Sequence, residues 1–162
     1  MEINLQLQRV EINRPYGDVI TDFENIVPLI DQVRLGELVN TGTDAGVIIN
    51  AINEMAGASH LTRFCSIRSG DLFSVLEGTP VEAVKYLVGN ALIAQKIFRH
   101  GLTAGLYVPF VLNFYGHQGR TILEYFRPSS FLVHVSRDTE VTNIGQTLDG
   151  LMTELVSKLN NS

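Results

Sequence analysis

Two apolar segments joined by a short turn constrain the fold of this chain more than any other feature. In residues 108–115, large apolar side chains at every second position give the two-residue period of a β-strand. A second apolar segment, residues 120–126, follows after only four residues, Gly116-His117-Gln118-Gly119. Glycines at both ends suit a tight connection, so the pattern predicts an antiparallel β-hairpin.

Strands and helices alternate along the rest of the chain. Strands are predicted from β-branched and aromatic content, and helices from apolar residues at helical spacing. The predicted strands are residues 3–12, 61–67 and 83–88, and the predicted helices run from Pro15 to about Pro28 and over residues 44–55, 91–99 and 140–159. Residues 34–46 are expected to be irregular and could include a short helical turn, and residues 70–76 fit either a buried helical turn or a short strand. The 91–99 helix is apolar around most of its circumference, so we expect it to be buried.

These elements predict one α+β domain over residues 1–162, with a mixed β-sheet of about five strands packed by helices and a C-terminal helix. We expect a mixed sheet because the strand at 83–88, the helix at 91–99 and the strand at 108–115 could form a parallel crossover. A chain of 162 residues can bury a core without a disulfide or a metal.

Charge and cysteine content exclude several classes of protein. Lys and Arg number 12 against 17 Asp and Glu, a net charge of −5 without a basic run, so nucleic acid is not an expected partner. No apolar run reaches the roughly 18 residues of a membrane span. The alternating N-terminus is unlike a signal peptide, so we expect a cytoplasmic protein with no membrane partner. The one cysteine, Cys65, is expected to be a buried, inert thiol. The four histidines lack metal-ligand spacing, so neither a metal nor a cofactor is predicted.

Three segments carry a family resemblance. They are residues 86–94 (YLVGNALIA), 107–109 (YVP) and 125–132 (YFRPSSFL). In this order they resemble the uncharacterised bacterial family known as domain of unknown function number 302, best over residues 84–159. The chain departs from the family pattern at Ala91, where proline is usual, at Val108, where alanine is usual, and at Phe131. The resemblance implies an α+β fold with a mixed sheet and a homodimer, and it implies no known reaction.

Two segments that follow predicted strands are candidates for ligand binding. Gly89 and Asn90 begin a helix, where free N–H groups could hold a carboxylate or phosphate, although Asn90 could equally be a plain N-cap. Arg127 could bind an anion with Ser129 and Ser130, or these serines could hydrogen-bond their own loop. If the two strand ends lie near one another, Asn90 and Ser129 line one pocket.

Aromatic residues gather around the predicted hairpin, where they could pack in the core, line a ligand pocket or form a dimer surface. No catalytic residue and no metal ligand is predicted. The predicted ligand-binding residues are Gly89, Asn90, Tyr107, Tyr125, Arg127, Ser129 and Ser130.

The sequence therefore predicts a small homodimeric module that binds a small ligand, which could be anionic, or a protein partner, without catalysis. The alternative is a small-molecule enzyme with a pocket around Asn90, Arg127 and Ser129 and a tyrosine or histidine as proton donor. A purely structural or interaction module is a third class. No carboxylate pair or nucleophile motif supports a glycosidase or a protease.

Overall fold

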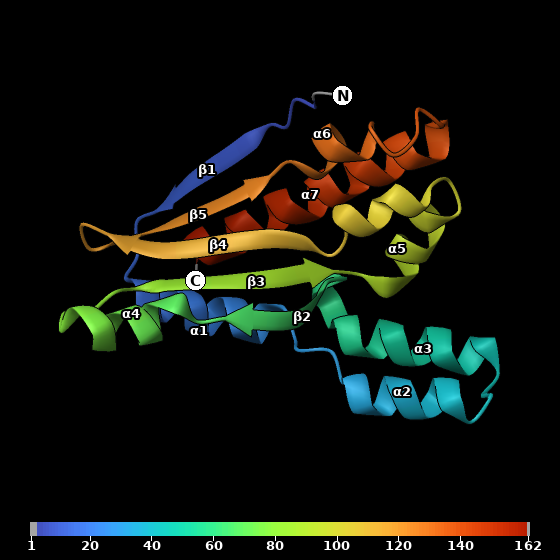
Figure 1. The fold of residues 1–162 in the computed structure, drawn as a ribbon, viewed down its shortest axis with the longest axis horizontal. Helices are drawn as coiled ribbons and strands as arrows, with labels where there is room; N and C mark the ends of the chain where they lie inside the picture. Colours follow the sequence, from blue (N-terminus) through green and yellow to red (C-terminus); the bar gives the residue numbers. More distant parts are fainter. Residues whose placement is uncertain (1–2, 162) are drawn as a thin grey trace.

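Five strands form one antiparallel sheet in the computed structural model, which describes residues 3–161 (Figure 1). The strand order is β1-β5-β4-β3-β2, and every neighbouring pair is antiparallel. The strands are β1 (Leu7–Ile12), β2 (Thr62–Ile67), β3 (Ala83–Gly89), β4 (Phe110–His117) and β5 (Arg120–Phe126). An α+β fold with a sheet of five strands is thus confirmed.

The predicted mixed sheet is wrong. The helix after β3 does not cross the sheet, and the chain returns into β4 from the same end, so that β3 and β4 pair antiparallel with Tyr86 opposite Leu112. Among the described residues, parallel pairing occurs at an isolated bridge between Leu29, which belongs to no strand, and Arg63 of β2.

Helices account for most of the remaining chain. They are α1 (Tyr16–Ile26), α2 (Gln32–Asn40), α3 (Ala45–Ala56), α4 (Ser69–Glu77), α5 (Ala91–Phe98), α6 (Pro128–Leu132) and α7 (Thr139–Asn161), with 3-10 turns η1 (Gly57–Ser59) and η2 (Leu102–Leu106). The C-terminal helix is confirmed, and the carboxylate of Asp138 accepts a hydrogen bond from the Glu140 N–H at its start. The helix extends beyond the predicted end at residue 159 and includes Asn160 and Asn161, whereas Ser162 lies outside the described residues.

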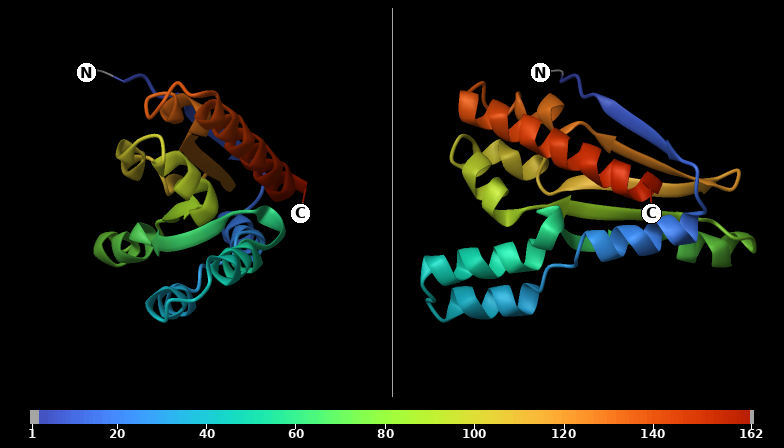
Figure 2. Two further views of the ribbon diagram at one scale, coloured as in Figure 1. Left: turned by 90° about the vertical axis from the view of Figure 1, so that its right-hand side faces the viewer. Right: turned by 180° about the vertical axis from the view of Figure 1, so that it is seen from behind.

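The core lies between α1, α7 and one face of the sheet, as Figures 1 and 2 show. Alternate residues of β3 and β4 are buried there because side chains of a strand point to opposite faces in turn. The ring of Phe23 in α1 lies 4.8 Å from the rings of both Tyr86 and Phe114. The Tyr86 hydroxyl donates to Glu24 at 2.7 Å, and burial together with this hydrogen bond raises the pKa of Tyr86.

The other face of the sheet is largely uncovered within the described residues, with α4 lying beside the start of β3. Lys85, Val111 and Phe126 point to this side and are exposed, and Figure 1 shows this face toward the viewer. An antiparallel sheet with one buried and one uncovered face is a common arrangement. We refer to this side, opposite Tyr86 and Leu112, as the open face.

Several local expectations need correction. The first strand begins at Leu7 rather than at residue 3, and Met1 and Glu2 lie outside the described residues. The segment expected to be irregular overlaps α2, which is longer than the single turn allowed for and begins at Gln32, where Asp31 caps it by accepting from the Arg34 N–H. The ambiguous segment at 70–76 is helical and lies within α4.

Two predicted burials are wrong. Cys65 is exposed, because β2 is an edge strand and Cys65 pairs with Leu87 on the open face. In α5 only Ile97 is fully buried, and the other apolar side chains of this helix remain partly accessible. The apolar surface of α5, which we expected to be buried, is therefore available for contacts with a ligand.

The hairpin turn yields a test of the backbone geometry. Both Gln118 (φ 53°) and Gly119 (φ 76°) have left-handed backbones, as in a type I′ turn, where asparagine fits better than glutamine. We expect Gln118→Asn to raise Tm by roughly 2 °C, corresponding to about 0.5–1 kcal/mol. Thermal denaturation by circular dichroism measures the shift. The β-branched Gln118→Val should lower Tm, and an equal Tm for both variants would contradict the assigned turn.

Candidate functional site

The two candidate segments leave the sheet at one end but do not meet. Because β3 and β5 both pair antiparallel with β4, they run in the same direction, and Asn90 and Arg127 follow them at the same end. However, β4 lies between them, and two strand spacings amount to about 10 Å. Asn90 lines an apolar pocket, whereas Arg127 and Ser129 line a separate polar cleft, so the predicted shared pocket does not form.

The apolar pocket lies along α5 and is open to solvent on one side. Its volume is about 480 Å³, which is within the range of small-molecule sites. Helix α5 and the segment leading into β4 supply most of the lining, and Phe64 of β2 and Leu148 of α7 add to it. The lining residues are Phe64, Gly89, Asn90, Ala91, Ile93, Ala94, Gln95, Phe98, Val108, Pro109, Phe110 and Leu148. We call this the α5 pocket.

The lining of the α5 pocket, as far as the described residues form it, carries no acid, base or nucleophile. Its polar side chains are the amides of Asn90 and Gln95. The Asn90 oxygen accepts from the N–H groups of Leu92 (2.9 Å) and Ile93 (3.2 Å), and its NH₂ donates to the His60 carbonyl (2.9 Å). Asn90 is therefore a satisfied N-cap, and the helix N–H groups proposed for an anion are already occupied.

Gly89 has a packing role at the edge of this pocket. A Cβ atom on Gly89 would lie 3.5 Å from Pro109 and 3.7 Å from Phe64, both of which line the pocket. Any side chain at residue 89 would therefore touch the pocket wall. A methyl group there would make ordinary van der Waals contacts, whereas a larger side chain would need space that the pocket wall occupies.

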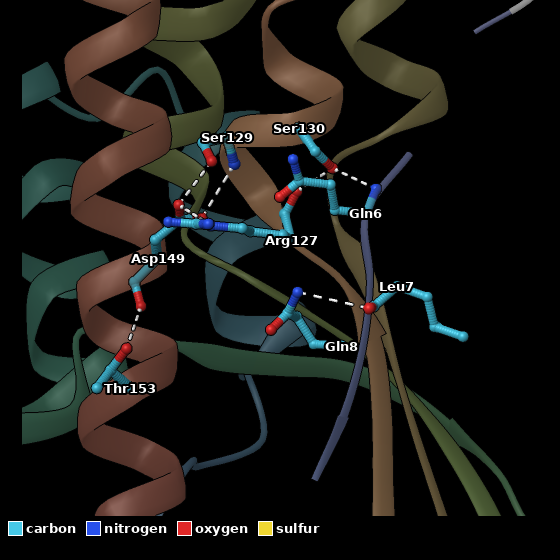
Figure 3. Close-up of polar contacts among 8 residues, drawn as sticks. All are labelled: Gln6, Leu7, Gln8, Arg127, Ser129, Ser130, Asp149 and Thr153. Carbon is cyan, nitrogen blue, oxygen red and sulfur yellow. Dashed lines mark hydrogen bonds and ion pairs between the residues drawn. The ribbon is translucent and has the colours of Figure 1, made fainter. Parts of the chain in front are cut away.

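The polar cleft is organised by one carboxylate, as Figure 3 shows. Asp149 of α7 accepts hydrogen bonds from Arg127 Nε (2.8 Å), from the Ser129 N–H (3.0 Å) and from Ser129 Oγ (2.6 Å). Ser130 Oγ donates to the Arg127 carbonyl (2.7 Å) and accepts from the Gln6 N–H (3.1 Å). We call these five residues the Asp149 clasp, since they hold α6 against α7 and against the chain that leads into β1.

Close packing and charge balance indicate that this clasp stabilises the fold. A Cβ on Gly145 of α7 would lie 2.9 Å from the Cα of Ser129, so α6 and α7 approach each other across a glycine. Arg127 is half-exposed, but its charge is balanced by Asp149, which is mostly buried. An anion bound to Arg127 would also meet this carboxylate.

Tyrosines 125 and 107 lie in two further places. Tyr125 lies beside the clasp in a small polar hollow with Gln8 and Thr153. Burial, and next the charge of Asp149, raise the pKa of Tyr125, so its hydroxyl stays protonated at neutral pH. Tyr107 stacks on Phe131 with ring centroids 5.4 Å apart and borders a hollow on the open face. The seven predicted site residues are thus distributed over four places.

Sequence reasoning missed the residues that matter most in both sites. Phe64, Phe98 and Leu148 of the α5 pocket come from three separate elements, and only Phe98 was indicated, by the all-round apolar pattern of α5. Asp149 gave no signal, because a carboxylate within a long amphipathic helix is normally solvated. Within residues 3–161 no group of three His, Cys, Asp or Glu side chains could hold a metal ion. No helix in this described part is both long and apolar enough to span a membrane.

The Asp149 clasp gives a stability prediction. Removing the carboxylate in Asp149→Ala leaves the Ser129 N–H and Oγ and the Arg127 guanidinium without their acceptor, so we expect a loss of about 2–3 kcal/mol in the free energy of unfolding. Asp149→Asn keeps an oxygen acceptor and should lose less. Urea denaturation monitored by circular dichroism measures both. The control is Glu154→Ala, which removes an exposed carboxylate from the same helix and should change the midpoint little. An unchanged midpoint for Asp149→Ala would contradict the structural role.

Comparison with known proteins bears on the fold. No protein-family model matches the sequence, and no curated protein matches it. Among solved structures, the uncharacterized conserved protein DUF302 from Bacillus stearothermophilus superposes with a TM-score of 0.61 at 14% sequence identity, over 94% of this chain and 97% of that one. At 14% sequence identity, this similarity is evidence for a shared fold alone. The resemblance seen in the sequence is confirmed at that level: the chain has the fold of a DUF302 protein.

Proposed function

We propose that this protein binds a small, largely apolar molecule in the α5 pocket and does no chemistry on it. The observation that carries the proposal is a pocket of about 480 Å³ whose lining is apolar apart from two amides. Such a pocket gains binding free energy by removing apolar ligand surface from water. Half-exposed apolar side chains of α5, which would otherwise face solvent, supply much of this surface.

The same lining favours a neutral ligand over an anionic one. The described lining contains no Lys, Arg or His, and the helix N–H groups nearest to it already bond Asn90. A charged group buried there would lose its hydration without gaining a partner. A polar end of the ligand could instead reach Gln95, which is exposed at the edge of the pocket.

Binding without catalysis is the better supported of the two hypotheses. An enzyme needs a proton donor, base or nucleophile within hydrogen-bond reach of the substrate. The candidates proposed for the enzyme alternative, Arg127 and Ser129, belong to another cleft, and both bond Asp149. We propose in addition that the chain acts as a homodimer. A cytoplasmic location and a bacterial origin stay predictions.

Binding can be tested with a neutral apolar probe, N-phenyl-1-naphthylamine, whose fluorescence rises in an apolar environment. We expect saturable binding with micromolar Kd to the wild-type chain. Ala94→Phe and Ala91→Phe each place a ring in the α5 pocket and should weaken binding at least tenfold.

The matched control is Ala45→Phe, which adds the same ring at an exposed position of α3. Its affinity for the probe should equal that of the wild type. Thermal denaturation checks that all variants fold. Either an absence of saturable binding or equal Kd values for wild type and both α5 variants would overturn the proposed function.

A further inference from the structure

Helix α4 is amphipathic with its apolar side outward. Leu72, Phe73, Val75 and Leu76 are exposed by 59%, 45%, 80% and 68%, and their spacing places them on one side of the helix. The residue of α4 that is buried is Gly70. A helix at a protein surface normally turns its large apolar residues toward the core, so α4 has the opposite orientation.

Backbone contacts hold α4 in this orientation. A Cβ on Gly70 would lie 2.3 Å from the Val81 carbonyl oxygen, so the helix approaches the following segment at a distance that only glycine permits. Ser74 Oγ donates to the Gly70 carbonyl (2.7 Å) and accepts from the Val81 N–H (2.8 Å). Small residues therefore face the domain, and rotation of α4 to bury its apolar side would break these contacts.

A complementary hollow lies at the other end of the open face. Its volume is about 440 Å³, and its lining is mostly apolar. The lining residues are Leu5, Lys85, Leu106, Tyr107, Pro109, Phe110, Val111, Phe126 and Phe131. Leu102 and Leu106 of η2 are about as exposed as Val75, the most exposed of the large apolar residues of α4, at 82% and 79%. We call this site the η2 hollow.

The two features lie on the same side of the sheet. In the left view of Figure 2, α4 and the η2 segment both project from the side opposite α7, and Figure 1 shows them at opposite ends of the strands. A two-fold axis between two facing copies, perpendicular to the line that joins α4 to the η2 hollow, would place α4 of each copy over the η2 hollow of the other. Such a contact uses the same surface on both copies and closes at two chains.

We propose that this surface is covered by a second copy of the chain, with α4 of each copy seated in the η2 hollow of the other. This interface rests on the homodimer that forms part of the proposed function, and it identifies the residues through which the two copies make contact. The proposal does not depend on a ligand in the α5 pocket, which shares Pro109 and Phe110 with the η2 hollow but is otherwise lined by other residues.

Charge complementarity favours a second copy as the occupant. Lys85 of the hollow makes no salt bridge within the described residues, whereas Asp71 and Glu77 flank the apolar side of α4. Two further charges on the open face, those of Arg9 and Glu124, pair with each other at 2.6 Å. Two copies therefore bring opposite charges together without bringing unpaired like charges into contact.

The available area also suits a dimer. Five strands about 4.8 Å apart and roughly 20–25 Å long present a face of about 500 Å². The exposed sides of α4 and η2 add to this on each copy. Two such surfaces reach the roughly 1,200–2,000 Å² that stable protein–protein interfaces bury.

Sedimentation velocity on the full chain tests the proposal. At micromolar concentration we expect a species of twice the 17.9 kDa chain mass. Leu76→Lys places a cation opposite Lys85 and should raise the dimer Kd at least 30-fold, and Leu106→Lys should act likewise at the hollow. Both residues are exposed in the single chain, so neither change should prevent folding. Val39→Lys on α2, with 59% exposure, is the matched control and should leave the dimer intact.

Mixing the two variants tests the reciprocal docking. A Leu76→Lys chain keeps a normal hollow, and a Leu106→Lys chain keeps a normal α4, so the mixture should form a mixed dimer more tightly than either variant dimerises alone. A wild-type chain that stays monomeric at 100-micromolar concentration would overturn both this interface and the proposed homodimer. A wild-type dimer that Leu76→Lys and Leu106→Lys leave unchanged would overturn this interface alone, and probe binding at the α5 pocket would stand in either case.

Discussion

The five-stranded sheet has two faces, and the helices of one chain bury only one of them. Helices α1 and α7 pack on the face that carries Tyr86, Leu112 and Phe114, and this layer contains the core. The opposite face keeps apolar side chains at the surface. The remaining features depend on this asymmetry, because α4 and η2 extend over the uncovered side while α5 closes only one end of the sheet.

The sequence analysis placed Asn90 and Ser129 in one pocket, but they belong to two separate regions. We assign a structural role to the Asp149 clasp and a binding role to the α5 pocket. Asp149 satisfies Ser129 and Arg127 and fixes α6 on α7, so the most polar cluster near the strand ends stabilises the fold. The apolar walls of the α5 pocket, in contrast, remain accessible to solvent. A small apolar ligand can cover such a concave apolar surface.

Local patterns in the sequence predicted local structure well. The hairpin, the C-terminal helix and the cap at Asn90 follow from turn chemistry and periodicity, which depend on neighbouring residues. Strand direction, the position of Asn90 relative to Ser129 and the exposure of Cys65 depend on strand order, which no local pattern contains. The orientation of α4 was equally hidden, because it follows from the contact of Gly70 with the backbone of Val81. These longer-range contacts decide which apolar residues form the core and which stay at the surface.

If two copies of the chain meet at their open faces, the apolar side chains of this surface lose contact with solvent only when the copies associate. Methyl NMR with a soluble paramagnetic agent can follow this loss, by comparing the methyl groups of Val111, Leu106 and Leu76 with those of Val39. We expect the first three to be protected from the agent at high protein concentration and to become accessible on dilution, while Val39 stays accessible throughout. Equal accessibility of all four residues at every concentration would contradict a contact between copies at the open face.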